Sequence, residues 1–184
     1  MAKMNRTLSP SEKRTLTVLD QLLQSAAVRA PIDAAVGPLE RKLAANSSAQ
    51  MAWETLPLSL LDPGLPETIR SSWVFILRGG AVTGAERHPN SHQRTLSYRG
   101  AGDLQTMEGG RWRSHALVSE PGAPLGERWV SIPANTWHQV VVRGGHWVVV
   151  SFHTAPAEQL IEERPDSDDA RASRRRLYVG ESAR

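Results

Sequence analysis

The first 50 residues and the hundred that follow carry different patterns of hydrophobic positions. In the first part, apolar residues recur every three or four positions, which is the period of one helix face. They are Leu16, Leu19, Leu22, Leu23, Ala26 and Ala27. Ahead of them, Ser9-Pro10-Ser11-Glu12 supplies the cap residue, the first-turn proline and the glutamate of a capping box. This pattern predicts a helix that begins near Pro10 and ends at Pro31.

A second helix is predicted from about Pro31 to Ala45, with Val36, Leu39 and Leu43 on one face and a kink or restart at Gly37-Pro38. An amphipathic stripe indicates only that something covers it. Residues 1–50 therefore form a helical arm. This arm either binds a partner, such as a second copy of the chain, or packs on the outside of the domain that follows.

From Trp53 onward, short runs rich in valine, isoleucine and tryptophan alternate with glycine pairs at hairpin positions. The predicted strands are Glu54–Leu61, Ser72–Arg78, Ala81–His88, Gln93–Arg99, Asp103–Glu108, Arg111–Val118, Arg128–Pro133, His138–Arg143 and Trp147–His153. Regularly spaced short strands without intervening helices predict an all-β sandwich or barrel over residues 51–163. A short helix is expected from about Pro156 to Glu163. Residues 164–184 are polar and are expected to form a flexible tail, apart from a contact through Leu177-Tyr178-Val179.

The 184 residues include no cysteine, which excludes disulfides, cysteine-ligated zinc, iron–sulfur clusters and a thiol nucleophile. No apolar run reaches the length of about 20 residues that crosses a bilayer. The first residues lack the apolar core of a signal peptide. We expect a cytoplasmic protein without a membrane partner.

The formal net charge is +3, and arginines gather beside aspartates near the C-terminus. These residues are Arg171, Arg174, Arg175 and Arg176 with Asp166, Asp168 and Asp169. Such a cluster either binds nucleic acid or an anionic surface, or forms a solvated tail of mixed charge. No aromatic interleaving or DNA-binding motif accompanies it, so no nucleic-acid partner is expected.

Polar side chains gather in two places inside the predicted barrel. Glu86 and His88 are two apart on a predicted strand and so point to the same face. After the turn at Pro89-Asn90-Ser91, Gln93 opens the next strand, with Thr95 and Ser97 on its face. Further on, a turn through Asn135, a residue type that tolerates left-handed backbone, places His138 at the start of another strand. Because unpaired buried polar groups cost about 1–3 kcal/mol each, an inward cluster of this kind needs a metal ion or a polar ligand.

These segments resemble the two motifs of the cupin superfamily. The first motif is matched in every spacing, with glutamate in place of its first histidine and glutamine in place of its glutamate. Its positions here are Gly80, Glu86, His88, Gln93 and Gly100. The second motif is matched at Pro133, Asn135 and His138, where Asn135 replaces a glycine. Val142 replaces its final asparagine, and Gly126 lies one residue too far upstream. The resemblance covers about residues 55–155 and implies an antiparallel, jelly-roll barrel.

By position, the resemblance implies that Glu86, His88, Gln93 and His138 are the ligands of a divalent metal ion: iron, manganese, nickel or zinc. Two histidines and one carboxylate are also the set found in the facial triad of non-heme iron oxygenases. Glu86 and Gln93 are the candidate catalytic residues, because Gln93 can orient bound water or substrate. The alternative is a metal-free pocket with a glutamate–histidine polar network.

Other residues are weaker candidates. Alternation turns His92 away from the face of Gln93, although from its place beside a loop it would replace Gln93 if it turned inward. His115 and Arg113 share a strand face and would bind an anionic substrate if that face points inward. His146 and His153 are expected to be structural or exposed.

Three functions follow from this pattern. The first is a metal-binding cupin that binds or transforms a small polar molecule, for example as an oxygenase or isomerase. The second is a non-catalytic module that binds a sugar or organic acid. The third is a metal-free sugar isomerase or epimerase with a histidine base and a tyrosine acid. Cupin barrels commonly dimerise, so the resemblance also implies a homodimer.

Overall fold

The computed structural model describes residues 8–61, 63–166 and 172–179. Two helices open the chain, α1 (Pro10–Gln24) and α2 (Ala26–Ala45). The capping box is confirmed at its first residue, because the Ser9 hydroxyl accepts a hydrogen bond from the Glu12 backbone N–H at 3.1 Å. The predicted helix boundary at Pro31 is wrong, since the first helix ends before Ser25 and Pro31 lies inside α2. The apolar face of α2 continues through the proline, and burial of that face offsets the lost backbone hydrogen bond.

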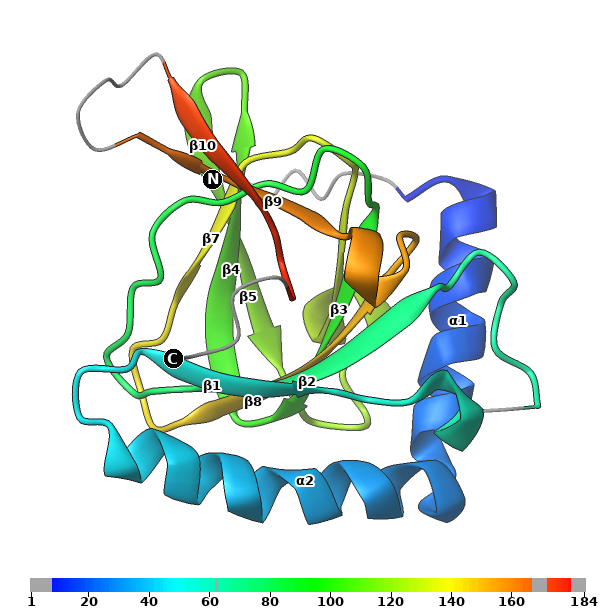
Figure 1. Ribbon diagram of the computed structural model, residues 1–184. Helices are drawn as coiled ribbons and strands as arrows, with labels where there is room; N and C mark the ends of the chain where they lie inside the picture. The colour runs from blue at the N-terminus through cyan, green and yellow to red at the C-terminus, as the bar shows by residue number, and fades with distance from the viewer. Residues whose placement is uncertain (1–7, 62, 167–171, 180–184) are drawn as a thin grey trace.

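In the part of the chain that the structure describes, ten strands follow in antiparallel pairs (Figure 1). Five of them form one sheet in the order β1 (Met51–Thr55), β2 (Ser71–Leu77), β8 (Trp147–His153), β3 (Gln93–Arg99) and β6 (Trp129–Ile132). Three form a second sheet in the order β5 (Arg111–Val118), β4 (Ala101–Glu108) and β7 (His138–Val141). The two sheets face each other as in a jelly roll. Among the described strands no ladder joins β5 to β6, so the barrel stays parted along that seam.

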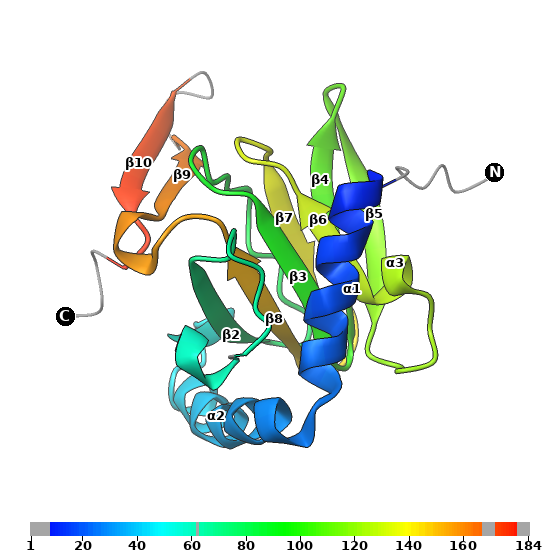
Figure 2. The ribbon, with the colours of Figure 1, turned by 90° about the vertical axis from the view of Figure 1, so that its right-hand side faces the viewer.

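Two apolar clusters hold these layers together. The inner cluster fills the space between the sheets and includes Leu77, Leu104, Val130, Trp147 and Val149. The outer cluster joins both helices to the opposite face of the five-stranded sheet and includes Leu16, Leu19, Ile32, Leu43, Val74, Ile76 and Phe152. Figure 1 shows α2 running beneath β1, β2 and β8, and Figure 2 shows α1 alongside β3 and β6. The helical arm therefore packs on the outside of the barrel, as one of the two roles expected for it requires.

Two carboxylates fix α1 to the barrel. Glu12 accepts hydrogen bonds from Arg94 of β3 at 2.7 and 2.8 Å. Asp20 pairs with Arg128 and accepts a hydrogen bond from the Trp129 indole N–H at 2.8 Å. Since these carboxylates lie eight residues apart on one helix, they fix both its position and its rotation.

Several predicted elements are wrong in detail. Residues 81–88 form isolated bridges at Val82, Glu86 and Arg87 rather than a strand, because Gly84 takes a left-handed conformation (φ 74°) that interrupts the pleat. The first barrel strand ends at Thr55 instead of continuing to Leu61.

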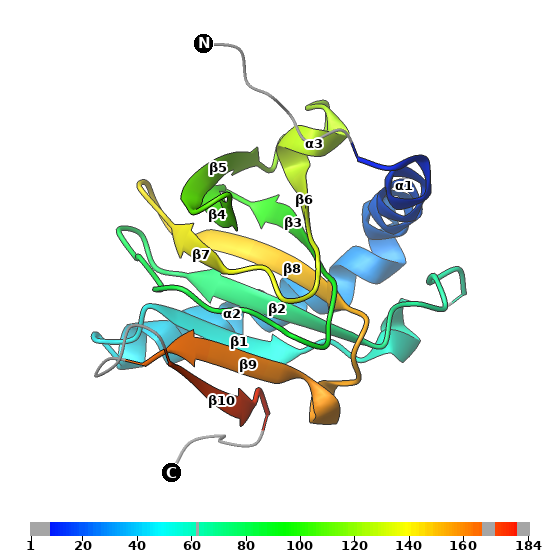
Figure 3. The same ribbon diagram turned by 90° about the horizontal axis from the view of Figure 1, so that it is seen from above.

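The end of the chain also differs from the prediction. The helix expected over 156–163 is a single 3-10 turn, Ala157–Gln159, followed by β9 (Ile161–Pro165). The supposed flexible tail contains β10 (Ser173–Leu177), which pairs with β9 through Arg175 opposite Glu163 and Arg176 opposite Glu162. These cross-strand charge pairs stabilise the hairpin. Figures 2 and 3 show the hairpin beside the two sheets, with β9 nearer to them. Arg171, Asp168 and Asp169 lie outside the described residues.

None of the described helices is both long and apolar enough to cross a membrane.

Candidate metal centre

Backbone pairing brings the two motif segments together inside the barrel. Glu86 and His138 exchange both backbone hydrogen bonds at 2.8 Å. Asn135 adopts the left-handed conformation expected for it (φ 63°), and its N–H donates to the carbonyl of His88 at 2.8 Å. The turn that begins the second segment is therefore tied directly to the first.

Three side chains meet there in a group with the geometry of metal ligands. One potential ligand atom from each of Glu86, His88 and His138 lies within 4.8 Å of the others. The His138 Nε2 and Glu86 Oε1 atoms are 3.6 Å apart, and the two imidazole centroids are 5.4 Å apart. Both histidines are buried, with exposed fractions of 4% and 3%.

The hydrogen bonds of the two histidines fix which ring nitrogen faces the group. The Nδ1 atom of His88 lies 2.9 Å from the carbonyl of Ile161 in β9, and that of His138 lies 3.0 Å from the carbonyl of Thr136. Because a carbonyl can only accept, each Nδ1 is the donor in its bond, and Nε2 is the nitrogen left to face the group. A backbone carbonyl that holds the other nitrogen is the usual support of a metal-binding histidine.

Two buried polar atoms beside this group lack a hydrogen-bond partner among the described residues: Nε2 of His138 and Oε1 of Gln93. Both residues line a cavity of about 40 Å³ between the two sheets, together with Glu86 and Thr95. The Gln93 amide nitrogen donates to Thr95 Oγ1 at 3.0 Å, so the amide oxygen is the atom left to face the cavity. A cavity of this size holds an ion or a water, since about 10–15 Å³ is enough for one water. The residues present therefore fit a small cation.

The electrostatics keep these groups in their metal-binding forms. Burial acts to raise the pKa of Glu86, but His138, His88 and Arg164 outweigh it and lower that pKa to about 2. Arg164 of β9 donates to Glu86 Oε2 at 2.8 Å. Burial and the neighbouring His138 lower the pKa of His88. At neutral pH the carboxylate is thus charged and His88 is neutral.

The structure separates the remaining candidates. Thr95 lines the cavity with Gln93. Ser97 does not: it lies further along β3, where its hydroxyl donates to the Gly100 carbonyl and accepts from the Trp147 indole at 2.8 Å. His92 is on the opposite face, as alternation predicted, with Nε2 2.7 Å from Ser131 Oγ. Arg113 and His115 do face inward, but they line a neighbouring cavity.

Sequence reasoning missed three residues around the centre. His153 is buried at 2% exposure, with its ring edge-on to His88 at 5.1 Å between centroids. Alternation along β8 places Val149, Ser151 and His153 on one face, so the pattern held a usable signal for this residue. Arg164 comes from the segment predicted to be a flexible tail, which carried no such signal. Tyr178, whose ring centroid lies 5.8 Å from that of His88, belongs to the stretch for which a contact was expected, although not one with this centre.

Two facing antiparallel sheets bring residues of both cupin-like motifs together at one interior centre. The fold is of the cupin type. No family model and no curated protein sequence matches the chain.

Similar solved structures include an oxalate oxidase in complex with the substrate analogue glycolate, with 15% identity over 60% of this chain and 54% of that one, and a TM-score of 0.47. The capsular polysaccharide assembling protein CapF from Staphylococcus aureus has 15% identity over 59% of this chain and 29% of that one, with a TM-score of 0.44. The oxalate decarboxylase of Lactobacillus farciminis has 11% identity over 58% of this chain and 29% of that one, with a TM-score of 0.45. This cupin fold spans about half the length of the oxalate oxidase.

Proposed function

We propose that this cupin binds a divalent metal ion through Glu86, His88 and His138, with the amide oxygen of Gln93 as a fourth ligand, and acts on a small polar molecule there. The observation that carries the proposal is the pair of unpartnered buried atoms, His138 Nε2 and Gln93 Oε1, lining one small cavity with the Glu86 carboxylate. Leaving two such atoms unpaired costs free energy that an ion would recover.

The donor set suits iron, manganese, nickel or zinc, because two imidazoles and a carboxylate serve all four. A bound ion would supply Lewis acidity and open positions for substrate or water. The side chains of the centre have the remaining roles. Glu86 provides the negative charge, the two backbone-held histidines fix the orientation of their rings, and the Gln93 amide orients whatever occupies the remaining space.

The direct test is the metal content of untagged protein purified without chelator, measured by elemental mass spectrometry. We expect near-stoichiometric metal in the wild type and its loss in a His88→Ala/His138→Ala variant. A His92→Ala/His146→Ala variant removes two histidines outside the centre and is expected to keep its metal. Wild-type protein that takes up none of Fe(II), Mn(II), Ni(II) or Zn(II) on reconstitution would contradict the proposal.

One observation favours a second candidate, a metal-free isomerase or epimerase. The ring of Tyr178 lies against that of His88, and burial, followed by the charges of Glu86 and Glu162, raises the pKa of Tyr178 well above its usual 10. Tyr178 therefore keeps its proton beside a neutral imidazole, as an acid–base pair requires. Loss of turnover in Tyr178→Phe, with metal-free wild-type protein fully active, would favour this function over the first.

A further inference from the structure

The cavity at the metal centre is too small for a substrate of several heavy atoms. It measures about 40 Å³. Beside it, the Ile161 carbonyl and the Arg164 side chain of β9 are hydrogen-bonded to His88 and Glu86. A substrate for the proposed function must therefore lie mainly in a neighbouring space.

A larger cavity of about 270 Å³ lies at the seam where β5 and β6 part. It shares a wall with the metal centre. Thr106, which lines it, is the cross-strand partner of His138, so the two side chains lie on the same face of the sheet. Thr136, which also lines it, accepts the Nδ1 proton of His138 through its carbonyl.

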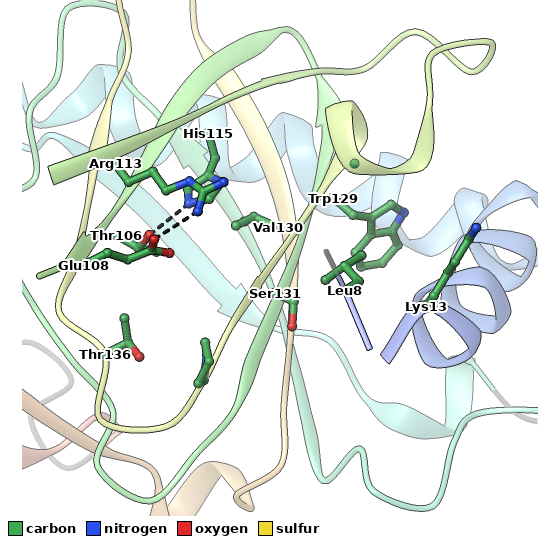
Figure 4. Close-up of a pocket in the computed structure, with 12 residues that line it drawn as sticks. Leu8, Lys13, Thr106, Glu108, Arg113, His115, Trp129, Val130, Ser131 and Thr136 are labelled. Atoms are coloured by element: carbon green, nitrogen blue, oxygen red, sulfur yellow. Dashed lines mark hydrogen bonds and ion pairs between the residues drawn. The ribbon is translucent and has the colours of Figure 1, made fainter. Parts of the chain in front are cut away.

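The two ends of this cavity differ in polarity (Figure 4). Thr106, His115, Arg113 and Glu108 gather at one end, where the Thr106 hydroxyl and His115 Nε2 are 2.9 Å apart and Arg113 lies 3.0 Å from Glu108. Leu8 and Trp129 lie at the other end with Lys13, and Val130 lies between the two ends. Two cationic side chains and one carboxylate line the cavity, so its formal charge is positive.

We infer that this seam cavity binds a small organic monoanion, with its acid group at the Arg113 end and its apolar body toward Trp129 and Leu8. The inference rests on the proposed function, because it supplies the substrate class of that metal centre. A guanidinium beside hydroxyl and imidazole groups suits a carboxylate, since a charged acceptor forms stronger hydrogen bonds than a neutral one. The polar end is also the end that borders His138, so the acid group would lie next to the metal centre.

Benzoate is a suitable probe, with the isosteric neutral amide benzamide as its control. We expect metal-free wild-type protein to bind benzoate, measured by titration calorimetry, and to bind benzamide at least about tenfold more weakly. Equal affinities for the two molecules, or no binding of benzoate, would overturn the inference.

Substitutions then locate the ligand. Arg113→Gln should weaken benzoate binding by about tenfold, the factor expected for losing one charge-assisted hydrogen bond. The Glu108→Gln/Arg113→Gln double variant restores the local charge balance, and its affinity for benzoate should be as low as that of Arg113→Gln. Arg111→Gln makes the same charge change on the same strand, at an exposed residue outside the cavity lining, and should leave affinity within about twofold. Unchanged affinity in both Arg113 variants would place benzoate elsewhere and refute the assignment.

A cavity-filling variant gives an independent test. Gly126 lines the cavity, and a Cβ built on it meets no atom of the described residues within 4 Å, so Gly126→Leu should fold and fill the space. It should abolish benzoate binding while metal content stays at the wild-type level. Because benzoate is titrated into metal-free protein, the two proposals fail separately. Benzoate binding without metal uptake rejects only the metal centre, and metal uptake without benzoate binding rejects only the seam cavity.

Discussion

At the scale of single residues, Gly102 of β4 packs closely against the indole of Trp147 in β8. Trp147 has no exposed surface, and a Cβ built on Gly102 would overlap its six-membered ring. This contact joins the two sheets, and it leaves no room for even one added carbon.

We predict that Gly102→Ala lowers the free energy of unfolding by about 1–3 kcal/mol, the usual cost of overpacking a rigid core. Gly122→Ala is the matched control, because a Cβ there meets no atom within 4 Å. Its effect should stay within about 0.5 kcal/mol. Urea denaturation of the three proteins measures both values, and equal stability of Gly102→Ala and wild type would refute the packing argument.

Much of the metal centre could be predicted residue by residue. Period-2 alternation, the turn at Asn135 and the spacing shared with the cupin motifs together predicted the grouping of Glu86, His88, Gln93 and His138. The same alternation failed for Ser97, because a shared face does not fix how far along the strand a side chain lies. Arg164 could not be predicted, since its role depends on how a later hairpin folds back onto the barrel.

At the scale of elements, helix α1 is held by two carboxylates with lowered pKa values. Burial acts to raise the pKa of Glu12 and of Asp20, but hydrogen bonds from Arg94 and Ser131 to Glu12, and from Arg128 and Trp129 to Asp20, outweigh it. The unfolded chain therefore binds these protons more readily than the folded one does.

Because the folded-state pKa of Glu12 lies below its ordinary value of 4.5, its contribution to stability is complete above that pH and is lost as the pH falls through the lowered value. Asp20 behaves in the same way from its ordinary value of 3.8. We predict a steeper fall in stability between pH 5 and pH 3 for wild type than for a Glu12→Gln/Asp20→Asn variant, measured by urea titration at each pH. If the unfolding free energies of the two proteins fall in parallel with pH, the two carboxylates have no such role in acid stability.

Asp20→Asn alone should cost about 3 kcal/mol at pH 7, because it leaves the largely buried Arg128 unpaired. Glu54→Gln, at an exposed position on β1, should change stability by less than about 0.5 kcal/mol. Thermal or urea unfolding of both variants measures this difference. A loss for Asp20→Asn no larger than for Glu54→Gln would contradict a docking role.

The β9–β10 hairpin supplies a cation, Arg164, to the carboxylate proposed as a metal ligand. A metal ion must share Glu86 with this guanidinium. We predict that Arg164→Gln lowers the melting temperature of metal-free protein, yet raises metal affinity by about tenfold, the effect of removing a nearby like charge. Arg174→Gln, which breaks an exposed pair with Asp166, should leave metal affinity unchanged. A lower affinity in Arg164→Gln would show that Arg164 supports the ion instead.

At the scale of the whole molecule, the apolar face of the helical arm packs against the five-stranded sheet. Trp112 of β5 is 38% exposed, and Val82, which bridges to Val141 of β7, is 50% exposed. The homodimer implied by the cupin resemblance remains a prediction. Sedimentation at micromolar concentration should give twice the 20.2 kDa chain mass, and a monomer would reject the dimer.

The β9–β10 hairpin also has a consequence for the order in which the molecule assembles. Arg164 follows Glu86 by 78 residues, and Ile161 follows His88 by 73. A growing chain emerges from its N-terminal end, so the two facing sheets can collapse before their last partners exist. The oriented His88 and the neutralised Glu86 then appear only when the final hairpin closes. Because contacts this far apart in sequence form slowly, nascent barrels would pass through an interval in which the centre is open to any cation in the surrounding medium.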